Sequence, residues 1–337
     1  MLGIEALNRF DYPLSERVIR NARGVIAHSR YVADAVKRIA PHVPVAQIPH
    51  EMPDIALLAQ QDARAKLNLP QDARLIGTFG NLGPTKRTTV LFEAFRTVHQ
   101  QYPNARLLLV GASSPNFDAR GLTEVFGLRD AVQIIGHVPF DQFHTYMAAM
   151  DVCVNLRYPT AGETSGAVLR GMALAKPQIV SRVGWFAELP DDAAAKIDVD
   201  DSEVAQLTTT LARLLQDHAL RAAIGENARR YVLTHCAAAD AARYYAEFMR
   251  AVLDGRAESI VFGNQAYPQA QPKNNQQSKI EIQNSEFENP KSEIKNQKSD
   301  DWRDNFARAY AELSLNADDV VLENIARAVT ALGLNEK

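Results

Sequence analysis

The stretch RLIGTFGNLGPTKRTTVLFEAFRTVHQQYPNARLLLVG, residues 74–111, contains two apolar runs separated by a segment with helical periodicity. Both runs are almost continuous Leu, Ile and Val, which is typical of parallel strands whose two faces are covered by helices. The stretch therefore predicts a strand, a helix and a second strand that belong to one parallel sheet.

The same alternation continues on both sides of this unit. Ser29 is a predicted N-cap for a helix between two strands near the N-terminus, and amphipathic helices over residues 200–253 are expected to cover the sheet. We predict an α/β fold with a doubly wound, Rossmann-like, mostly parallel sheet. Beyond residues 74–111, strands are predicted at 25–29, 43–49, 132–136, 151–156 and 177–181, and helices at 30–40, 62–70, 118–127, 139–150 and 165–175.

Composition divides the chain into four predicted regions. Residues 1–70 are an N-terminal α/β segment and residues 71–255 the main domain. Residues 256–300 are predicted to be a disordered linker, because from 263 onward they are rich in Asn, Gln, Ser and Lys and contain Pro290. Residues 301–337 regain helical periodicity and predict a small helical tail.

Charge and cysteine usage narrow the function classes. The 337 residues carry a formal net charge of -3, with no long basic run, which argues against a nucleic-acid partner. Cys153 and Cys236 have no metal-ligand spacing and favour a reduced, cytoplasmic protein. Within the sequence, no apolar run is long enough to span a bilayer, whereas peripheral contact with a membrane stays open.

The loop GNLGPTKR, residues 80–87, follows the first strand of the opening stretch. Backbone N–H groups near Gly80 and Gly83, the start of the next helix and the Lys86 ammonium together suit an anionic phosphate. The alternative is a Gly-Pro turn with a solvated Lys-Arg pair, and the loop alone does not decide between the two.

The loop RYPTAGETSG, residues 157–166, follows another predicted strand. Glu163 can accept hydrogen bonds from sugar hydroxyls, and a helix that starts at Ser165 and Gly166 offers N–H groups to a diphosphate. The alternative is an exposed acid beside Thr164 or Ser165 as a simple N-cap. Because both loops should open on one crevice, they favour a nucleotide-sugar ligand.

Four segments in this order resemble the C-terminal, donor-binding domain of family-4 glycosyltransferases, which have the two-domain GT-B fold: GTFGNLGPTKRTTVLFEAF, YPNARLLLVG, VQIIGHVP and MDVCVNLRYPTAGETSGAVLRGMALAKPQIVSRVGWFAELP. The resemblance covers residues 74–253, and residues 24–50 resemble the end of the N-terminal domain. It implies retaining transfer of a hexose from a UDP- or GDP-sugar to a glycan, lipid-linked or protein acceptor, without a metal or other cofactor, as in polysaccharide biosynthesis.

The resemblance carries over residue by residue. Lys86 matches the lysine that contacts the donor diphosphate, and Asn81 stands where an arginine is usual. His137 and Val138 match the backbone segment that lies against the nucleobase. Glu163 takes the place of the acid that holds the donor sugar, one position along from Gly162.

Arg170 stands where the family has its ribose-binding glutamate, and it cannot accept hydrogen bonds from a ribose. It either faces the diphosphate or forms a salt bridge on its helix. Glu188 matches an acid at a helix start, and His28 and His50 are expected to be structural.

The N-terminal half of the family's fold is expected to be truncated here. We expect either a shortened gene product or a companion chain that supplies the acceptor half. A catalytically silent module that binds nucleotide sugars or a partner is the alternative function. A Rossmann oxidoreductase lacks its dinucleotide fingerprint in this sequence.

Overall fold

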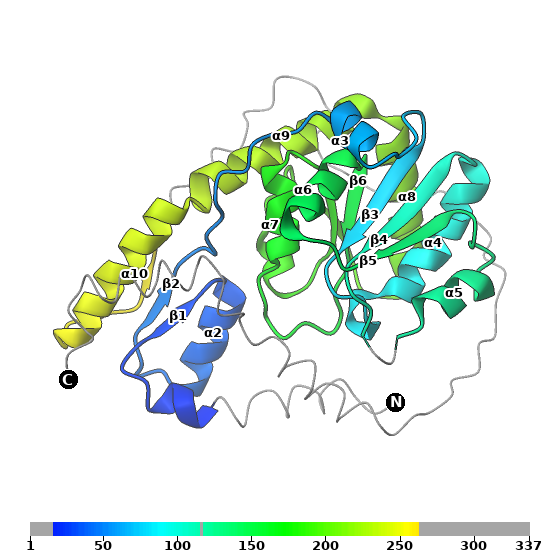
Figure 1. Ribbon diagram of the computed structural model, residues 1–337. Helices are drawn as coiled ribbons and strands as arrows, with labels where there is room; N and C mark the ends of the chain where they lie inside the picture. Colours follow the sequence, from blue (N-terminus) through cyan, green and yellow to red (C-terminus); the bar gives the residue numbers. More distant parts are fainter. Residues whose placement is uncertain (1–15, 115–116, 263–337) are drawn as a thin grey trace, which may run out of the picture. The chain divides into compact units, whose positions relative to one another are not determined.

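Six parallel strands form the main sheet of the computed structural model, in the order β5-β4-β3-β6-β7-β8 (Figure 1). The structure describes residues 16–114 and 117–262, and the predicted tail lies outside them. The strands are β3 (Arg74–Phe79), β4 (Ala105–Val110), β5 (Val132–Gly136), β6 (Val152–Asn155), β7 (Gln178–Ser181) and β8 (Ala195–Ile197). The three-residue strand β8 has no counterpart among the predicted strands.

Helices cover both faces of this sheet. One face packs against α3 (Gln60–Lys66), α6 (Phe140–Ala149), α7 (Gly166–Ala173) and α9 (His218–His235). The other packs against α4 (Thr88–Gln101), α5 (Ala119–Val125) and α8 (Glu203–Gln216). Within β3, Leu75 and Phe79 belong to the first core and Ile76 to the second. Burial on both faces explains why the strand sequences are apolar throughout.

The order of the strands reverses between β3 and β6. The chain adds β4 and β5 on one side of β3 and then returns to place β6, β7 and β8 on the other side. In a parallel sheet of this kind, ligands bind beyond the carboxyl ends of the strands at the point of reversal. The loops that follow β3 and β6 therefore border the crevice where a ligand is expected.

A separate sheet contains β1 (Val25–Ala27), β2 (Val45–Gln47) and β9 (Ile260–Val261), all parallel. Between β1 and β2, α2 (Arg30–Ile39) begins at the predicted N-cap, since the Ser29 hydroxyl accepts the Val32 N–H at 3.2 Å. The helix α10 (Ala238–Leu253) precedes β9.

Strand β9 corrects one prediction. Residues 260–261 were expected within the disordered linker, but they pair with β2, and Phe262 packs against Tyr244 of α10. Three consecutive apolar residues at this point outweigh the polar composition around them. The remainder of the predicted linker, from residue 263 onward, lies outside the described residues.

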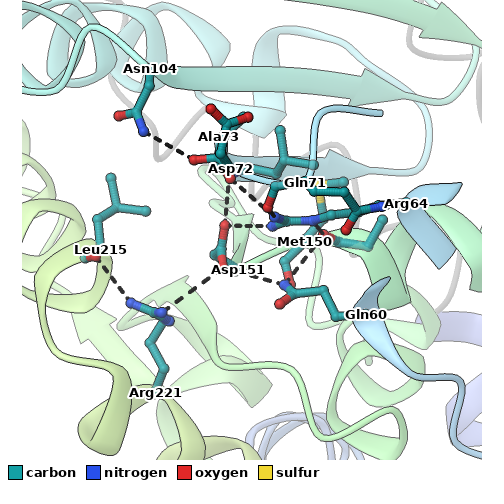
Figure 2. Close-up of polar contacts among 12 residues, drawn as sticks. Gln60, Arg64, Gln71, Asp72, Ala73, Asn104, Met150, Asp151, Leu215 and Arg221 are labelled. Carbon is teal, nitrogen blue, oxygen red and sulfur yellow. Dashed lines mark hydrogen bonds and ion pairs between the residues drawn. The ribbon is translucent and has the colours of Figure 1, made fainter. Parts of the chain in front are cut away.

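A buried polar cluster ties the amino end of β6 to its neighbours (Figure 2). Asp151, directly before β6, accepts the Leu75 N–H at 2.7 Å and pairs with Arg64 of α3 at 2.8 Å. Arg64 also donates to three backbone carbonyls, those of Ala149, Gln71 and Ala73. This network fixes α3 against the sheet at the end opposite to the crevice.

Candidate functional site

Lys86 ends the short helix η1 (Pro84–Lys86), which follows β3. Its Nζ donates to the carbonyl oxygen of Phe79 at 3.1 Å and to Oδ1 of Asn155 at 2.8 Å. Lys86 is only 7% exposed, so the alternative of a solvated Lys-Arg turn is wrong for this residue. Arg87 is also engaged, in an ion pair with the buried Glu203.

Burial has a strong effect on the Lys86 ammonium. Removal from water, together with the nearby Arg157, lowers the pKa of Lys86 to about 7, and Glu163 partly opposes both effects. A lysine with this pKa gains or loses its charge near neutral pH. An anion bound beside it would favour the charged form.

Glu163 lies in the loop after β6, where several groups hold its carboxylate. Oε1 is 2.8 Å from Nε of Arg157, and Oε2 accepts hydrogen bonds from the Thr160 hydroxyl and the Ala161 N–H, both at 2.9 Å. The Glu163 side chain is still 35% exposed. The carboxylate is thus fixed in position, and it keeps a surface at which hydroxyl groups can donate hydrogen bonds.

Contacts between the two loops bring Lys86 and Glu163 into one site. Nη1 of Arg157 donates to the Thr85 hydroxyl at 3.2 Å, and the Tyr158 N–H donates to the Thr85 carbonyl at 2.9 Å. The loop after β3 and the loop after β6 are therefore held together at the point where the strand order reverses. The site combines two cations with one carboxylate.

The first turn of α7 adjoins this loop. The Ser165 hydroxyl accepts the Val168 N–H at 3.3 Å, so Ser165, and not Thr164, is the N-cap of α7. Gly166 leaves space for a guanidinium, since a Cβ built there would lie 2.5 Å from Nη1 of Arg170. That guanidinium also lies over the Phe140 ring, 4.6 Å from its centroid. Arg170 itself lies in the last turn of α7, and its guanidinium reaches back to the first turn.

The remaining predicted donor residues lie in several positions. Gly80 has a φ of 92° and Asn81 is exposed, so this turn stays open beside Lys86. His137 is exposed after β5, whereas Val138 is half-buried and packs against the core. If a nucleobase binds here, backbone atoms and His137 are the groups that can meet it.

Thr164 lines a different cavity, with a volume of about 250 Å³, together with His28, His50 and Glu188. Glu188 caps the amino end of α2, since its carboxylate accepts the N–H groups of Arg30 at 2.9 Å and Tyr31 at 2.7 Å. The sequence predicted that Glu188 serves the start of a nearby helix, but Glu188 is the last residue of its own short helix, Gly184–Glu188, and serves the start of α2. The sequence did not indicate that this helix comes from the N-terminal sheet.

Sequence reasoning missed three residues of the site: Thr85, Asn155 and Arg157. Asn155 and Arg157 follow the apolar run of β6 by position, so polar residues at a strand's carboxyl end were the available signal. Their partners are about 70 residues away in sequence, and only the strand order brings them together.

Two absences hold for the part of the chain that the structure describes. Within residues 16–114 and 117–262, His, Cys, Asp and Glu side chains form no group of three or more that could hold a metal ion. In the same ranges, every helix is too short or too polar to span a membrane.

Relatives of this chain are D-inositol 3-phosphate glycosyltransferases. Those of Corynebacterium urealyticum and Salinispora arenicola are 29% and 28% identical to it over 178 and 237 residues. The alignments cover 50% and 64% of this chain and 41% and 52% of the relatives. The chain thus spans about half the length of the curated relatives it matches.

Solved structures share the fold. Sucrose-phosphate synthase from Thermosynechococcus elongatus superposes with a TM-score of 0.66 at 24% identity, over 75% of this chain and 64% of that one. Anabaena HepE in complex with UDP and glucose superposes with a TM-score of 0.63 at 18% identity, over 74% of this chain and 69% of that one. Both superpose on the parallel α/β fold that the sequence predicted for this chain.

A family model completes the comparison. The model described as "Glycosyl transferases group 1" matches residues 59–231, slightly more than half of the 337 residues. The matched region contains the whole six-stranded sheet, with Lys86, Asn155, Arg157 and Glu163. The chain belongs to the group 1 glycosyl transferases.

Proposed function

We propose that this chain binds a UDP- or GDP-sugar and transfers its hexose to a glycan, lipid-linked or protein acceptor. One observation carries the proposal: Arg157 and Thr85 join the Lys86 loop to the Glu163 loop where the strand order reverses. This arrangement offers positive charge for a diphosphate and a fixed carboxylate for sugar hydroxyls within one site. Membership of a transferase family supports the reaction class.

In the proposed reaction, Lys86 and the amino end of α7 bind the donor diphosphate. Both stabilise the negative charge that develops on the leaving nucleotide, which is how fixed donors accelerate such transfers. Arg170 faces the diphosphate at the first turn of α7, where an anion would offset its charge. Following the family-4 resemblance, we propose that the sugar keeps its anomeric configuration and that no metal takes part.

Glu163 orients the donor sugar in this proposal. Arg157, Thr160 and Ala161 hold its carboxylate, so little freedom is lost when a sugar hydroxyl donates to it. His137 and the backbone at Val138 border the nucleobase. Anabaena HepE has been solved with UDP-glucose, and we propose a nucleotide sugar as the donor class here.

The acceptor side is proposed to come from elsewhere. The chain spans about half the length of its curated relatives, and we propose that a second half of the fold, in the same protein or in a companion chain, contributes to the acceptor site. Such an assembly would complete the second wall that a transfer reaction needs to exclude water. We propose a cytoplasmic location with peripheral membrane contact when the acceptor is lipid-linked.

A second candidate is a module that binds nucleotide sugars without transferring them. The engagement of Glu163 favours it, since the carboxylate already has partners on both oxygens. In this case the site would retain the diphosphate contacts and lack turnover.

The experiment is release of nucleoside diphosphate from UDP-glucose, GDP-glucose and ADP-glucose, measured by chromatography alongside calorimetric binding. With the acceptor side supplied, we expect one donor to bind and to turn over with wild type and with Lys37→Met, a change in an exposed lysine of α2. Lys86→Met should lose about 10- to 100-fold in affinity, equal to a charged hydrogen bond. Binding without turnover supports the silent module, and neither binding nor turnover contradicts the donor site.

A further inference from the structure

Asn155 is the last residue of β6 and is 1% exposed. Its Oδ1 accepts a hydrogen bond from Nζ of Lys86 at 2.8 Å. Because a lysine ammonium can only donate, this contact fixes which end of the amide faces Lys86. Nδ2 must point the other way, and within residues 16–114 and 117–262 it has no hydrogen-bond partner.

Packing does not account for an asparagine at this position. The other three residues of β6 are Val152, Cys153 and Val154, and all are fully buried. An amide with an unpartnered buried N–H group destabilises the folded state relative to an apolar side chain of similar size. What the amide provides is an acceptor for Lys86.

Both acceptors of Lys86 are neutral. One is the Phe79 carbonyl and the other is the Asn155 amide, so neither cancels the charge of the ammonium. The carboxylate nearest to the site, Glu163, is paired with Arg157 instead, at 2.8 Å. The two acceptors use two of the three ammonium N–H groups and leave one for a further acceptor.

We propose that Asn155 is a positioning residue of the donor site: its side-chain oxygen fixes the Lys86 ammonium at the carboxyl ends of β3 and β6 without neutralising it, so that the charge is kept for the donor diphosphate. This inference rests on the proposed function. An aspartate here would compete with the diphosphate for the lysine, and a leucine would leave the ammonium without its acceptor.

The charged groups that face Lys86 are Arg157 and Glu163, both from the loop after β6; β3 contributes only the Phe79 carbonyl and β6 only Asn155. The pKa of Lys86 is about 7, with burial as the main cause. Near neutral pH, a change in the acceptor at position 155 therefore changes the fraction of Lys86 that is charged. Loss of the acceptor lowers that pKa further, and a carboxylate raises it.

The test is the pH dependence of UDP-glucose binding, measured by calorimetry between pH 6 and 9. The diphosphate of this probe is a diester, so its charge is constant over this range. We expect wild-type affinity to fall as pH rises through the Lys86 pKa. In Asn155→Leu the midpoint of this fall should move to lower pH, and in Asn155→Asp to higher pH by about one unit or more.

Asn104→Asp is the matched control. Asn104 is exposed at the amino end of β4, and its Oδ1 also accepts from a cation, Nη1 of Arg74, at 3.0 Å. The control should keep the wild-type midpoint and affinity. Unchanged midpoints in both Asn155 variants, while wild type binds, overturn this inference alone. If wild type binds neither UDP-glucose nor the GDP and ADP sugars, the proposed function fails together with it.

Discussion

Strand β6 has a buried polar side chain at each end, and each holds a cation. Asp151 at the amino end holds Arg64, and Asn155 at the carboxyl end holds Lys86 (Figure 2 shows the first). At the amino end Asp151 is a direct counterion to Arg64, with Arg221 3.9 Å from its other oxygen, and each nitrogen of the Arg64 guanidinium has a partner. At the carboxyl end both acceptors of the Lys86 ammonium are neutral, and Nδ2 of Asn155 lacks a partner among the described residues.

This difference separates a structural cluster from a binding site. Complete hydrogen bonding and a direct counterion for a buried charge are what a buried network needs in order to stabilise a fold. A buried cation without a directly bonded carboxylate lowers stability, and such perturbed groups cluster at binding and catalytic sites. Strand β6 thus connects a cluster that stabilises the sheet, at its amino end, with a site that can bind an anion, at its carboxyl end.

The largest expected effect is at the amino end. Asp151→Ala leaves the Arg64 guanidinium buried without its carboxylate, which should lower the free energy of unfolding by about 3–5 kcal/mol. Urea denaturation measures it. The control is Asp198→Ala, which breaks the exposed pair with Arg182 and should cost about 1 kcal/mol or less. Equal losses in the two variants would contradict a structural role for the Asp151 cluster.

The opposite result is expected at the carboxyl end. The double variant Lys86→Met with Asn155→Leu replaces a buried cation and an amide by apolar side chains of similar size. Its free energy of unfolding should equal that of wild type or exceed it by about 1–4 kcal/mol. Nucleotide binding should be lost in the same variant. A clear loss of stability on urea denaturation would mean that Lys86 and Asn155 stabilise the fold, as the Asp151 cluster does.

Stability should also depend on pH through Lys86. Its pKa is about 7 in the folded chain and about 10.4 when unfolded, so between these values the unfolded state binds more protons. The free-energy cost of burying the charged Lys86 side chain is therefore full below pH 7 and disappears as the pH rises through this range. The free energy of unfolding should increase by up to about 1.4 kcal/mol per pH unit.

This slope is best measured between pH 7 and 8.5, as the difference between wild type and Lys86→Met, because other titrating groups then cancel. Lys86→Met should lack the pH-dependent part of the unfolding free energy that comes from Lys86. Parallel curves for the two proteins would show that Lys86 keeps its charge throughout, and the distinction between the two ends would then rest on Asn155 alone.

The smallest expected effect concerns Ser165, which lies beyond the carboxyl end of β6 and whose hydroxyl has a hydrogen-bond partner. Ser165→Ala removes the N-cap of α7 and should cost about 1 kcal/mol of unfolding free energy. Thr89→Ala, an exposed change in the first turn of α4, is the control and should cost less. A cap that proves neutral would mean that hydrogen bonding at this end contributes little even where it is satisfied.

Much of the fold could be predicted from the sequence because it depends on local patterns. Continuous apolar runs identified β3, β4, β5, β6 and β7, and Ser29 and Ser165 identified two helix starts through their own hydroxyl groups. Lys86 could be placed at a ligand-binding edge from its position after a strand. Strand β8 escaped prediction because Lys196 interrupts its apolar residues, and β9 because it contains only two residues.

The partners within the site could not be predicted. Asn155 meets Lys86 only because β6 lies next to β3, and the sequence does not state that order. The same holds for Glu188, which caps a helix that begins 158 positions before it. Side-chain chemistry could be read position by position, whereas the contacts depend on how distant segments pack.

The most direct measurement of the central claim is a thermal-shift screen of UDP, GDP, ADP and their sugars against wild type, Lys86→Ala and the exposed control Lys37→Ala. At 100-fold excess over its Kd, a true ligand adds about 2.7 kcal/mol and should raise the melting temperature by about 5 °C or more. We predict this rise for one nucleotide in wild type and Lys37→Ala and its loss in Lys86→Ala. An equal shift in all three proteins, or none in wild type, would contradict the account.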